Sequence, residues 1–303
     1  MLIELEDLTK TYGAVTALSG LSVALPGGAV GLLGPNGAGK TTMIRALLGL
    51  IRIDSGRGRV LGMDVESQAL EVRRAVGFVP EDECLFPGVT GVGFVAYAGE
   101  LVGMPRRDAL RRAHEMLDYV GLDEARYRRV ESYSTGMKQR LKIAAGIVHD
   151  PKLLILDEPT NGMDPAGRVE ILDLCRDLAR AKGMNLLISS HLLPDVEAVC
   201  EHVVVLGKGR LLAQGRIVDL KRPHDRQYEV RVRGDRAAFA RLLADRGARA
   251  EPVDDRLLVS LPDGSGTAAL WEAAETASEQ IRMLRPRRST LEEVFLQAVE
   301  GAG

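Results

Sequence analysis

The amino-acid sequence predicts an α/β fold in which a parallel sheet with crossover helices is followed by a small α+β domain. Short apolar segments alternate with longer stretches of helical periodicity, which is typical of parallel strands joined by helices. A glycine-rich turn links one of these strands to a helix. The segment Lys221–Asp225 is polar and helix-breaking, which predicts a linker. We therefore assign residues 1–220 to the first domain and residues 225–303 to the second.

The first elements are strands. Ile3–Leu5 and Leu21–Leu25 alternate apolar and polar residues, which predicts two half-buried strands. Ala29–Leu33 predicts a buried strand that leads through Gly34–Gly39 into a helix over Lys40–Leu48. Further buried strands are predicted at Val76–Val79, Leu153–Leu156, Asn185–Ser189 and Val203–Leu206.

Helical periodicity dominates between Asp82 and Ser132, and it predicts an α-helical subdomain over about residues 82–135. A second helical pattern follows Pro165. The predicted buried face of the subdomain consists of Leu110, Ala113, Met116, Leu117 and Val120. The arginines that lie off this face are expected to be solvated.

The second domain alternates strand and helix patterns. We predict a strand at Tyr228–Val232, a helix at Arg236–Asp245, two strands at about Ala250–Leu261, a helix at Thr267–Ser278, a strand at Gln280–Leu284 and an amphipathic helix from Ser289.

The composition excludes several classes of protein. The net charge of −2 over 303 residues gives no field that would attract nucleic acid or acidic lipid. Cys84, Cys175 and Cys200 form no CxxC pair, which argues against a disulfide framework or zinc site and fits a reducing cytosol. The acidic N-terminus is unlike a signal peptide, and the longest uncharged run is shorter than the roughly 20 residues of a membrane span. We expect a soluble chain whose membrane role requires a partner.

A phosphate-binding motif follows the strand Ala29–Leu33. Gly34–Thr41 reads GPNGAGKT and matches GxxxxGK[ST] in full. Glycines let backbone N–H groups converge on phosphates, and the following helix adds its positive end. Lys40 supplies a positive charge, and the Thr41 hydroxyl can bind Mg²⁺. The predicted nucleotide contacts here are Gly34, Pro35, Asn36, Gly37, Ala38, Gly39, Lys40, Thr41 and Thr42.

Two carboxylates end the strand that begins at Leu153. Asp157 is placed to hold Mg²⁺ beside Thr41, and Glu158 is placed to accept a proton from an attacking water. Kinases, GTPases and helicases share this pair of motifs, so the pair predicts nucleotide chemistry and leaves its class open.

The segment between these motifs resembles the signature of ABC ATPases. Tyr133–Arg140 reads YSTGMKQR, in which Ser134 and Gly136 open a helix that offers a hydroxyl and N–H groups to an anion. The resemblance implies a P-loop NTPase core of the ABC ATPase type, with a mixed sheet, an antiparallel β edge and a helical subdomain. It also implies a head-to-tail dimer in which Ser134 caps the γ-phosphate held by the other subunit.

Other positions match the family in order. Tyr12 is similar to the aromatic residue that stacks on adenine, Asp164 lies in a segment similar to the D-loop, and His191 is similar to the switch histidine. The resemblance makes Glu158, His191 and Lys40 the catalytic residues. Glu81 stands where the family usually has glutamine, and we expect it to contact nucleotide and metal.

The signature and the final segment both point toward export. Thr135 and Met137 replace a glycine and a glutamine of the usual signature, a variant common among exporter ATPases, as is Glu81. Arg285–Leu296 resembles the closing segment of bacterial drug-resistance, gliding-motility and efflux ATPases. The resemblance therefore implies ATP and Mg²⁺ as ligands, a membrane-spanning permease, and a location on the inner face of the cell membrane.

Several alternatives stay open. One is an ABC ATPase that acts on DNA or ribosomes, although the chain has no long coiled-coil insertion, second ATP module or basic stripe. Another is a binding module without activity. The uncharged segment Phe86–Gly99 is either a docking surface for the permease or part of the subdomain core. The cargo, the choice between homodimer and heterodimer, and the role of the second domain are not determined by the sequence.

Overall fold

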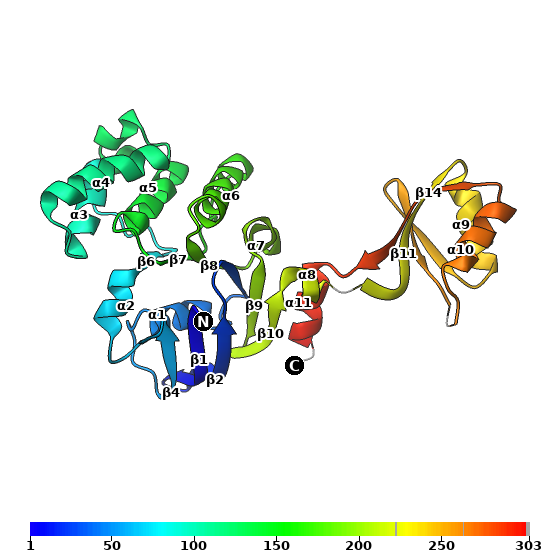
Figure 1. Cartoon of the computed structure of the whole chain (residues 1–303), viewed down its shortest axis with the longest axis horizontal. Helices are drawn as coiled ribbons and strands as arrows, with labels where there is room; N and C mark the ends of the chain where they lie inside the picture. The colour runs from blue at the N-terminus through cyan, green and yellow to red at the C-terminus, as the bar shows by residue number, and fades with distance from the viewer. Residues whose placement is uncertain (222, 263, 301–303) are drawn as a thin grey trace. The chain divides into compact units, whose positions relative to one another are not determined.

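The computed structural model describes residues 1–221, 223–262 and 264–300. The contacts within the chain define two compact units (Figure 1). Unit 1 contains Met1–Ile217 together with residues 297–300, and unit 2 contains Val218–Leu296. Unit 1 has two sheets, unit 2 has one, and each unit has its own core.

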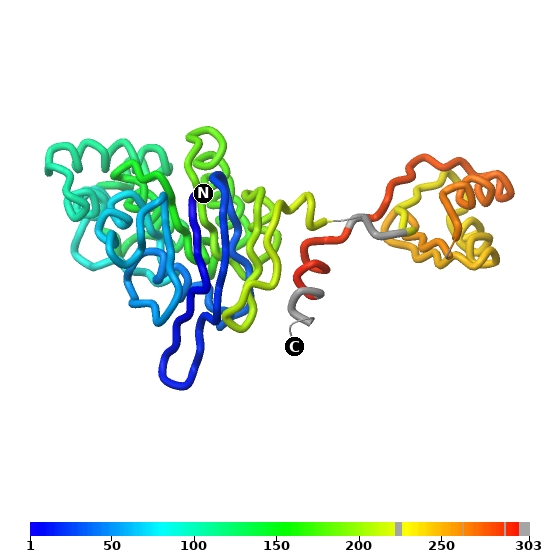
Figure 2. Tube along the Cα trace, turned by 60° about the horizontal axis from the view of Figure 1, so that its bottom comes forward, coloured from blue at the N-terminus to red at the C-terminus, as the bar shows by residue number. Residues whose placement is uncertain are grey.

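An antiparallel four-stranded sheet opens unit 1, with the strand order β2-β1-β4-β5. The central strand β1 pairs with both neighbours, since Ile3 lies opposite Leu25 on one side and Val60 on the other. The strands are β1 (Ile3–Tyr12), β2 (Val15–Leu25), β4 (Ser55–Val60) and β5 (Met63–Asp64). Figure 2 shows the β1–β2 hairpin, in dark blue, projecting from this unit.

A six-stranded sheet with the order β10-β9-β3-β8-β7-β6 forms the centre of unit 1. Its strands pair in parallel except for β10, which is antiparallel to β9. The strands are β3 (Ala29–Leu33), β6 (Val76–Val79), β7 (Leu153–Asp157), β8 (Asn185–Ser190), β9 (His202–Gly207) and β10 (Arg210–Arg216). The two sheets together give the mixed, antiparallel-edged α/β fold that the sequence predicts.

Helices complete unit 1. Those next to the sheets are α1 (Lys40–Leu47), α2 (Ala69–Ala75), α6 (Pro165–Arg180) and α7 (Leu193–Val199). The helical subdomain contains α3 (Gly91–Leu101), α4 (Arg106–Tyr119), α5 (Thr135–Ile147) and the 3₁₀ turns η1 (Glu124–Tyr127) and η2 (Val130–Ser132). The short helix α8 (Ile217–Leu220) follows β10.

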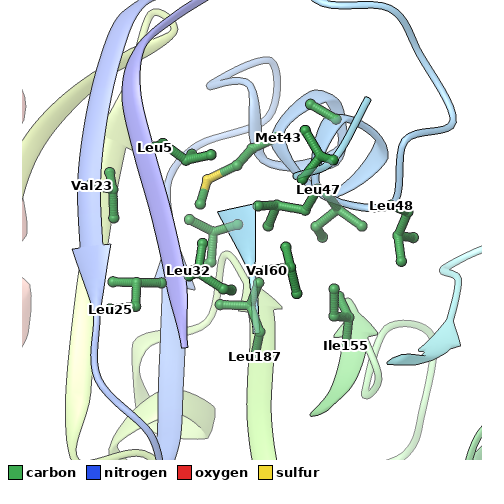
Figure 3. Close-up of a cluster of buried hydrophobic side chains, with 14 of the residues drawn as sticks. Leu5, Val23, Leu25, Leu32, Met43, Leu47, Leu48, Val60, Ile155 and Leu187 are labelled. Carbon is green, nitrogen blue, oxygen red and sulfur yellow. The ribbon is translucent and has the colours of Figure 1, made fainter. Parts of the chain in front are cut away.

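The core of unit 1 lies around α1, between the two sheets. Met43 and Leu47 of α1 pack beside Leu5 of the antiparallel sheet and Leu32 of the parallel sheet (Figure 3). All four side chains are almost fully buried. Burial of each such side chain contributes about 1.5–3 kcal/mol. This packing holds the first turn of α1, and therefore Lys40, against the end of β3.

The structure corrects two expectations in detail. Leu110, predicted on the buried face of the helical subdomain, is 45% exposed, and Ala109 is buried in its place. The buried row on α4 is therefore Ala109, Ala113 and Leu117, spaced by four residues each. The strand β11 already begins at Pro223, inside the predicted linker; Arg222 lies outside the described residues.

Unit 2 is a four-stranded antiparallel sheet with two packed helices. The strand order is β12-β13-β11-β14. Its elements are β11 (Pro223–Arg233), α9 (Arg236–Asp245), β12 (Arg249–Val253), β13 (Arg256–Ser260), α10 (Ala268–Thr276) and β14 (Gln280–Arg288). Val230, Phe239, Val259 and Leu270 lie at the centre of its core. The final helix is α11 (Leu291–Glu300).

No helix of the described residues combines the length and the apolar composition that a bilayer crossing requires.

Candidate functional site

Three neighbouring parallel strands bring the predicted site residues to one edge of the central sheet. Leu33 of β3 pairs with Ser190 of β8, and Asp157 of β7 pairs with Ser189 of β8. The loops that leave these strands carry Gly34, Glu158 and His191. Because the strands are parallel, all three loops leave from the same edge, where ligands of open α/β sheets bind.

Two glycines of the Gly34–Thr41 loop are required by its geometry. Gly39 has φ +103°, and a Cβ there would lie 2.7 Å from the carbonyl oxygen of Ala17. A Cβ on Gly34 would lie 2.6 Å from the carbonyl oxygen of Leu206. Any larger residue would push the loop away from β2 or β9, so the glycines allow the loop to curl tightly over the start of α1.

A cleft of about 760 Å³ opens at this loop. This volume lies within the roughly 300–1,000 Å³ of typical ligand pockets. Its lining residues are Val15, Thr16, Ala17, Pro35, Asn36, Gly37, Ala38, Gly39, Lys40, Thr41, Thr42, Glu81, Glu158, Asn161, His191 and Lys208. Predicted residues from four separate segments thus meet in one cleft.

Lys40, Glu158 and His191 form a connected group in the cleft. Glu158 Oε1 lies 3.3 Å from Lys40 Nζ, and Glu158 Oε2 lies 2.8 Å from His191 Nδ1. The backbone N–H of His191 also donates to Oε2 at 3.3 Å. Lys40 Nζ donates to the carbonyl of Gly34 at 2.7 Å. The Lys40 and Glu158 side chains are both 7% exposed, so water screens their interaction little.

Glu158 also has an unusual backbone. Its φ is +48°, in the left-handed region that non-glycine residues seldom adopt. Its backbone N–H donates to the carbonyl of Ser189 at 3.0 Å, which ties the turn to β8. Such strain is found at sites where a side chain must be aimed, and here it directs the carboxylate toward Lys40 and His191.

Thr41 and Asp157 form an oxygen-rich pair beside this group. The Thr41 hydroxyl donates to Asp157 Oδ2 at 3.1 Å. Asp157 is 2% exposed, and no described residue provides a hydrogen-bond partner for its buried Oδ1. A buried carboxylate oxygen without a partner fits a hard cation with its water ligands, because Mg²⁺ prefers oxygen. The residues present therefore fit Mg²⁺.

Glu81 reaches the cleft from the loop after β6. Its Oε1 accepts a hydrogen bond from Asn161 Nδ2 at 2.8 Å. Both residues line the cleft, and Asn161 N donates to the carbonyl of Glu158 at 3.1 Å. Glu81 thus lies in the cleft, and among the described residues no hydrogen bond joins its side chain to Thr41 or Asp157.

The remaining predicted residues do not line the cleft of their own chain. Tyr12 lies at the end of β1, 46% exposed, with Lys10 Nζ 5.3 Å from its ring centroid. Ser134 caps α5 by accepting from Met137 N at 3.3 Å, and Gly136 follows in the first turn. Asp164 is the N-cap residue of α6. Ser134 and Gly136 therefore lie at the start of α5 and Asp164 at the start of α6, and none of the three lines the cleft.

Two segments that line the cleft were not predicted from the sequence. Val15–Ala17 and Lys208 both line it. Gly209 N donates to Ala38 O at 3.0 Å, and Ser19 N donates to Gly209 O at 2.9 Å, which brings the β9–β10 turn beside the loop. Lys208-Gly209 carries a turn signal in the sequence, but that signal does not indicate which distant segment the turn contacts.

Comparisons with known proteins relate the chain to one family. Residues 18–161 match the family described as ABC transporter. The chain is 40% identical over 221 residues to the uncharacterized ABC transporter ATP-binding protein YxlF of Bacillus subtilis, covering 73% of this chain and 72% of that protein. It is 37% identical over 305 residues to the daunorubicin/doxorubicin resistance ATP-binding protein DrrA of Streptomyces peucetius, covering 97% and 91%.

A solved structure shows the same fold. The cbiO1 protein of Clostridium perfringens, described as part of the ABC transporter complex cbiONQ, superposes with a TM-score of 0.65 at 28% identity. The match covers 71% of this chain and 88% of cbiO1.

Proposed function

The chain belongs to the ABC transporter family of ATP-binding proteins, and we propose that it powers an exporter by ATP-driven closure of a head-to-tail dimer. The chain binds ATP and hydrolyses it to ADP and phosphate. The observation that carries the proposal is the group formed by Lys40, Glu158 and His191 in a cleft built by the glycine loop.

The glycine loop and Lys40 bind the triphosphate. The start of α1 presents backbone N–H groups and the positive end of the helix dipole to the phosphates. Lys40 provides the positive charge that offsets negative charge developing on the transferred phosphoryl group. Tyr12 provides an exposed ring on which adenine can stack.

Thr41, Asp157 and Glu81 would hold Mg²⁺, through oxygen atoms directly or through water. When bound, Mg²⁺ neutralises phosphate charge. Asp157 contributes the buried oxygen that lacks a partner, and Thr41 contributes its hydroxyl. Glu81 extends this oxygen-rich edge from the loop after β6.

Glu158 accepts a proton from the water that attacks the terminal phosphate. The oxygen–phosphorus bond to water forms as the terminal phosphoanhydride bond breaks, and ADP leaves. His191 holds the carboxylate in place through the contact of 2.8 Å and through its backbone N–H. General-base catalysis of this kind contributes roughly 100- to 10,000-fold in rate.

A second copy of the chain, or a paralogue, completes each site. Ser134, Gly136 and Asp164 stand apart from the cleft of their own chain, while the N-terminus of α5 carries a hydroxyl and a positive helix end suited to phosphate. In the closed dimer this helix tip caps the triphosphate held by the other subunit. Repulsion between the products then reopens the pair.

The exporter role rests on similarity to a resistance protein. The relative DrrA is described as a daunorubicin/doxorubicin resistance protein, and it aligns with 97% of this chain. We propose a membrane-spanning permease as the partner, which places this chain at the inner face of the cell membrane. A groove of about 370 Å³ in the helical subdomain, with exposed Phe86, Tyr97 and Leu110 on its wall, provides an apolar surface for a cytoplasmic helix of that permease.

Phosphate release from ATP tests the enzymatic part of the proposal. The purified chain is expected to release phosphate from ATP in the presence of Mg²⁺, and Lys40→Ala is expected to abolish release. Lys152→Ala, at an exposed lysine of the turn before β7, is the matched control and should retain wild-type turnover. Equal turnover in the wild type and Lys40→Ala would refute the assignment of the cleft.

A further inference from the structure

Lys142 is a buried lysine on α5, about two turns after Ser134. It is 7% exposed. Its Nζ donates to three consecutive backbone carbonyls, those of Pro80 at 2.7 Å, Glu81 at 3.3 Å and Asp82 at 3.0 Å. The three donors of an ammonium group are thus matched by three acceptors of one loop.

This arrangement fixes the position of the loop that carries Glu81. A buried ammonium group is costly unless its donors are satisfied, so the loop carbonyls and Lys142 hold each other in place. A neighbouring lysine behaves differently. Lys138, one turn earlier on α5, forms an ion pair with Glu83 in which both side chains are more exposed, at 27% and 62%. Exposed pairs of that kind contribute little to stability.

Lys142 joins the loop that carries Glu81 to the helix α5. The loop ends at the nucleotide cleft, where Glu81 accepts from Asn161 at 2.8 Å. The helix α5 begins at Thr135, and its N-cap residue Ser134 does not line that cleft. Within one subunit, Lys142 therefore connects the loop at the subunit's own nucleotide with the helix that would contact the nucleotide of the other subunit.

We propose that Lys142 is a positioning residue that couples the two nucleotide sites of the dimer. It transmits a shift of Glu81 to the tip of α5, and a shift of that tip back to Glu81. The proposal rests on the proposed function, because it requires the composite site made with Ser134. It adds to the proposed function the contact between Lys142 and the three loop carbonyls, in which the glycine loop, Asp157 and Glu158 take no part.

The test separates coupling from packing by replacing Lys142 with methionine. Lys142→Met keeps a flexible chain of similar length but removes the donors to the three carbonyls. We expect unchanged affinity for a fluorescent ATP analogue, a fall in kcat on the order of 10-fold, and a Hill coefficient for ATP hydrolysis that falls toward 1. Lys142→Arg retains the charge and several donors, and it should restore a Hill coefficient above 1.

Two further variants make the experiment decisive. Lys152→Met makes the same chemical change at an exposed lysine and should behave as the wild type. If Lys142→Met does not fold, Lys142→Gln replaces it, because glutamine has no charge and only two N–H donors for the three carbonyls. A lowered Hill coefficient with unchanged nucleotide affinity in that variant supports the proposal. A wild-type Hill coefficient and kcat in folded Lys142→Met or Lys142→Gln overturns it. A wild type without phosphate release, or with a Hill coefficient of 1, would instead count against the proposed function.

Discussion

Glu158 and His191 contact each other across two strand ends, with Glu158 Oε2 2.8 Å from His191 Nδ1. The neighbouring strands β7 and β8 bring these residues together although they are far apart in the sequence. The other carboxylate oxygen faces Lys40. The carboxylate is therefore oriented from both sides, as the proposed role of general base requires.

Glu158→Gln is expected to separate binding from hydrolysis. The amide keeps the size of the side chain but cannot accept the proton, so kcat should fall roughly 100- to 10,000-fold while ATP still binds. Phosphate release and size-exclusion chromatography in ATP measure the two effects, and a closed dimer should accumulate. Glu170→Gln, at an exposed glutamate of α6 paired with Arg140, should match the wild type. Turnover at the wild-type rate in Glu158→Gln would show that Glu158 is not the general base.

Mg²⁺ dependence tests the role of Asp157. Chelation of divalent cations should abolish phosphate release, and added Mg²⁺ should restore it. Asp157→Asn should raise the Mg²⁺ concentration at half-maximal activity by about 10- to 100-fold, because in the proposed site the buried carboxylate would hold the metal through its water ligands. Asp173→Asn, at an exposed aspartate paired with Arg176 on α6, is the control. If Asp157→Asn and the wild type needed the same Mg²⁺ concentration for half-maximal activity, the assignment of Asp157 to the metal site would be contradicted.

The stability of unit 2 should depend on pH through Glu229. Hydrogen bonds from Arg285, at 2.7 and 3.1 Å, and from Arg256 hold the pKa of Glu229 below its ordinary value of 4.5. Because the folded-state pKa is the lower one, the contribution is complete above pH 4.5 and is lost as the pH falls through the folded-state pKa. Glu229→Gln should therefore lower stability at pH 7 but have little effect at the lowest pH.

Urea unfolding followed by fluorescence measures this effect. The only tryptophan of the chain, Trp271, lies on α10 and reports on unit 2. Glu251→Gln, at an exposed glutamate paired with Arg249 on β12, is the control. If the difference in unfolding free energy between the wild type and Glu229→Gln grew as the pH fell below 4.5, the prediction would be contradicted.

Much of the fold follows from local patterns. Ala29–Leu33 and Val76–Val79 are strands with the predicted bounds, because continuous apolar residues in a buried strand leave a clear signal. The strand β4 escaped prediction because Ser55–Val60 is polar and glycine-rich, and it is held by pairing with distant β1. The exposure of Leu110 depends on how α4 packs, and one helix's periodicity does not determine that.

The candidate site was also predictable from the sequence only in part. The glycine loop and the Asp157–Glu158 pair were visible as continuous motifs, and the structure places most of their residues in one cleft. Lys208 and Lys142 were not visible, because each contributes through a contact with a segment far away in the sequence. The roles assigned to individual site residues stay predictions until the variants are measured.

Mixing two inactive variants tests the composite site most directly. Lys40→Ala lacks the phosphate-binding lysine, and Ser134→Arg blocks the tip of α5; each alone should be inactive. In a mixed dimer, the intact cleft of one subunit meets the intact Ser134 of the other, so mixing is expected to restore part of the phosphate release. Mixed dimers that form without any recovery, or a Ser134→Arg chain with full activity by itself, would contradict it.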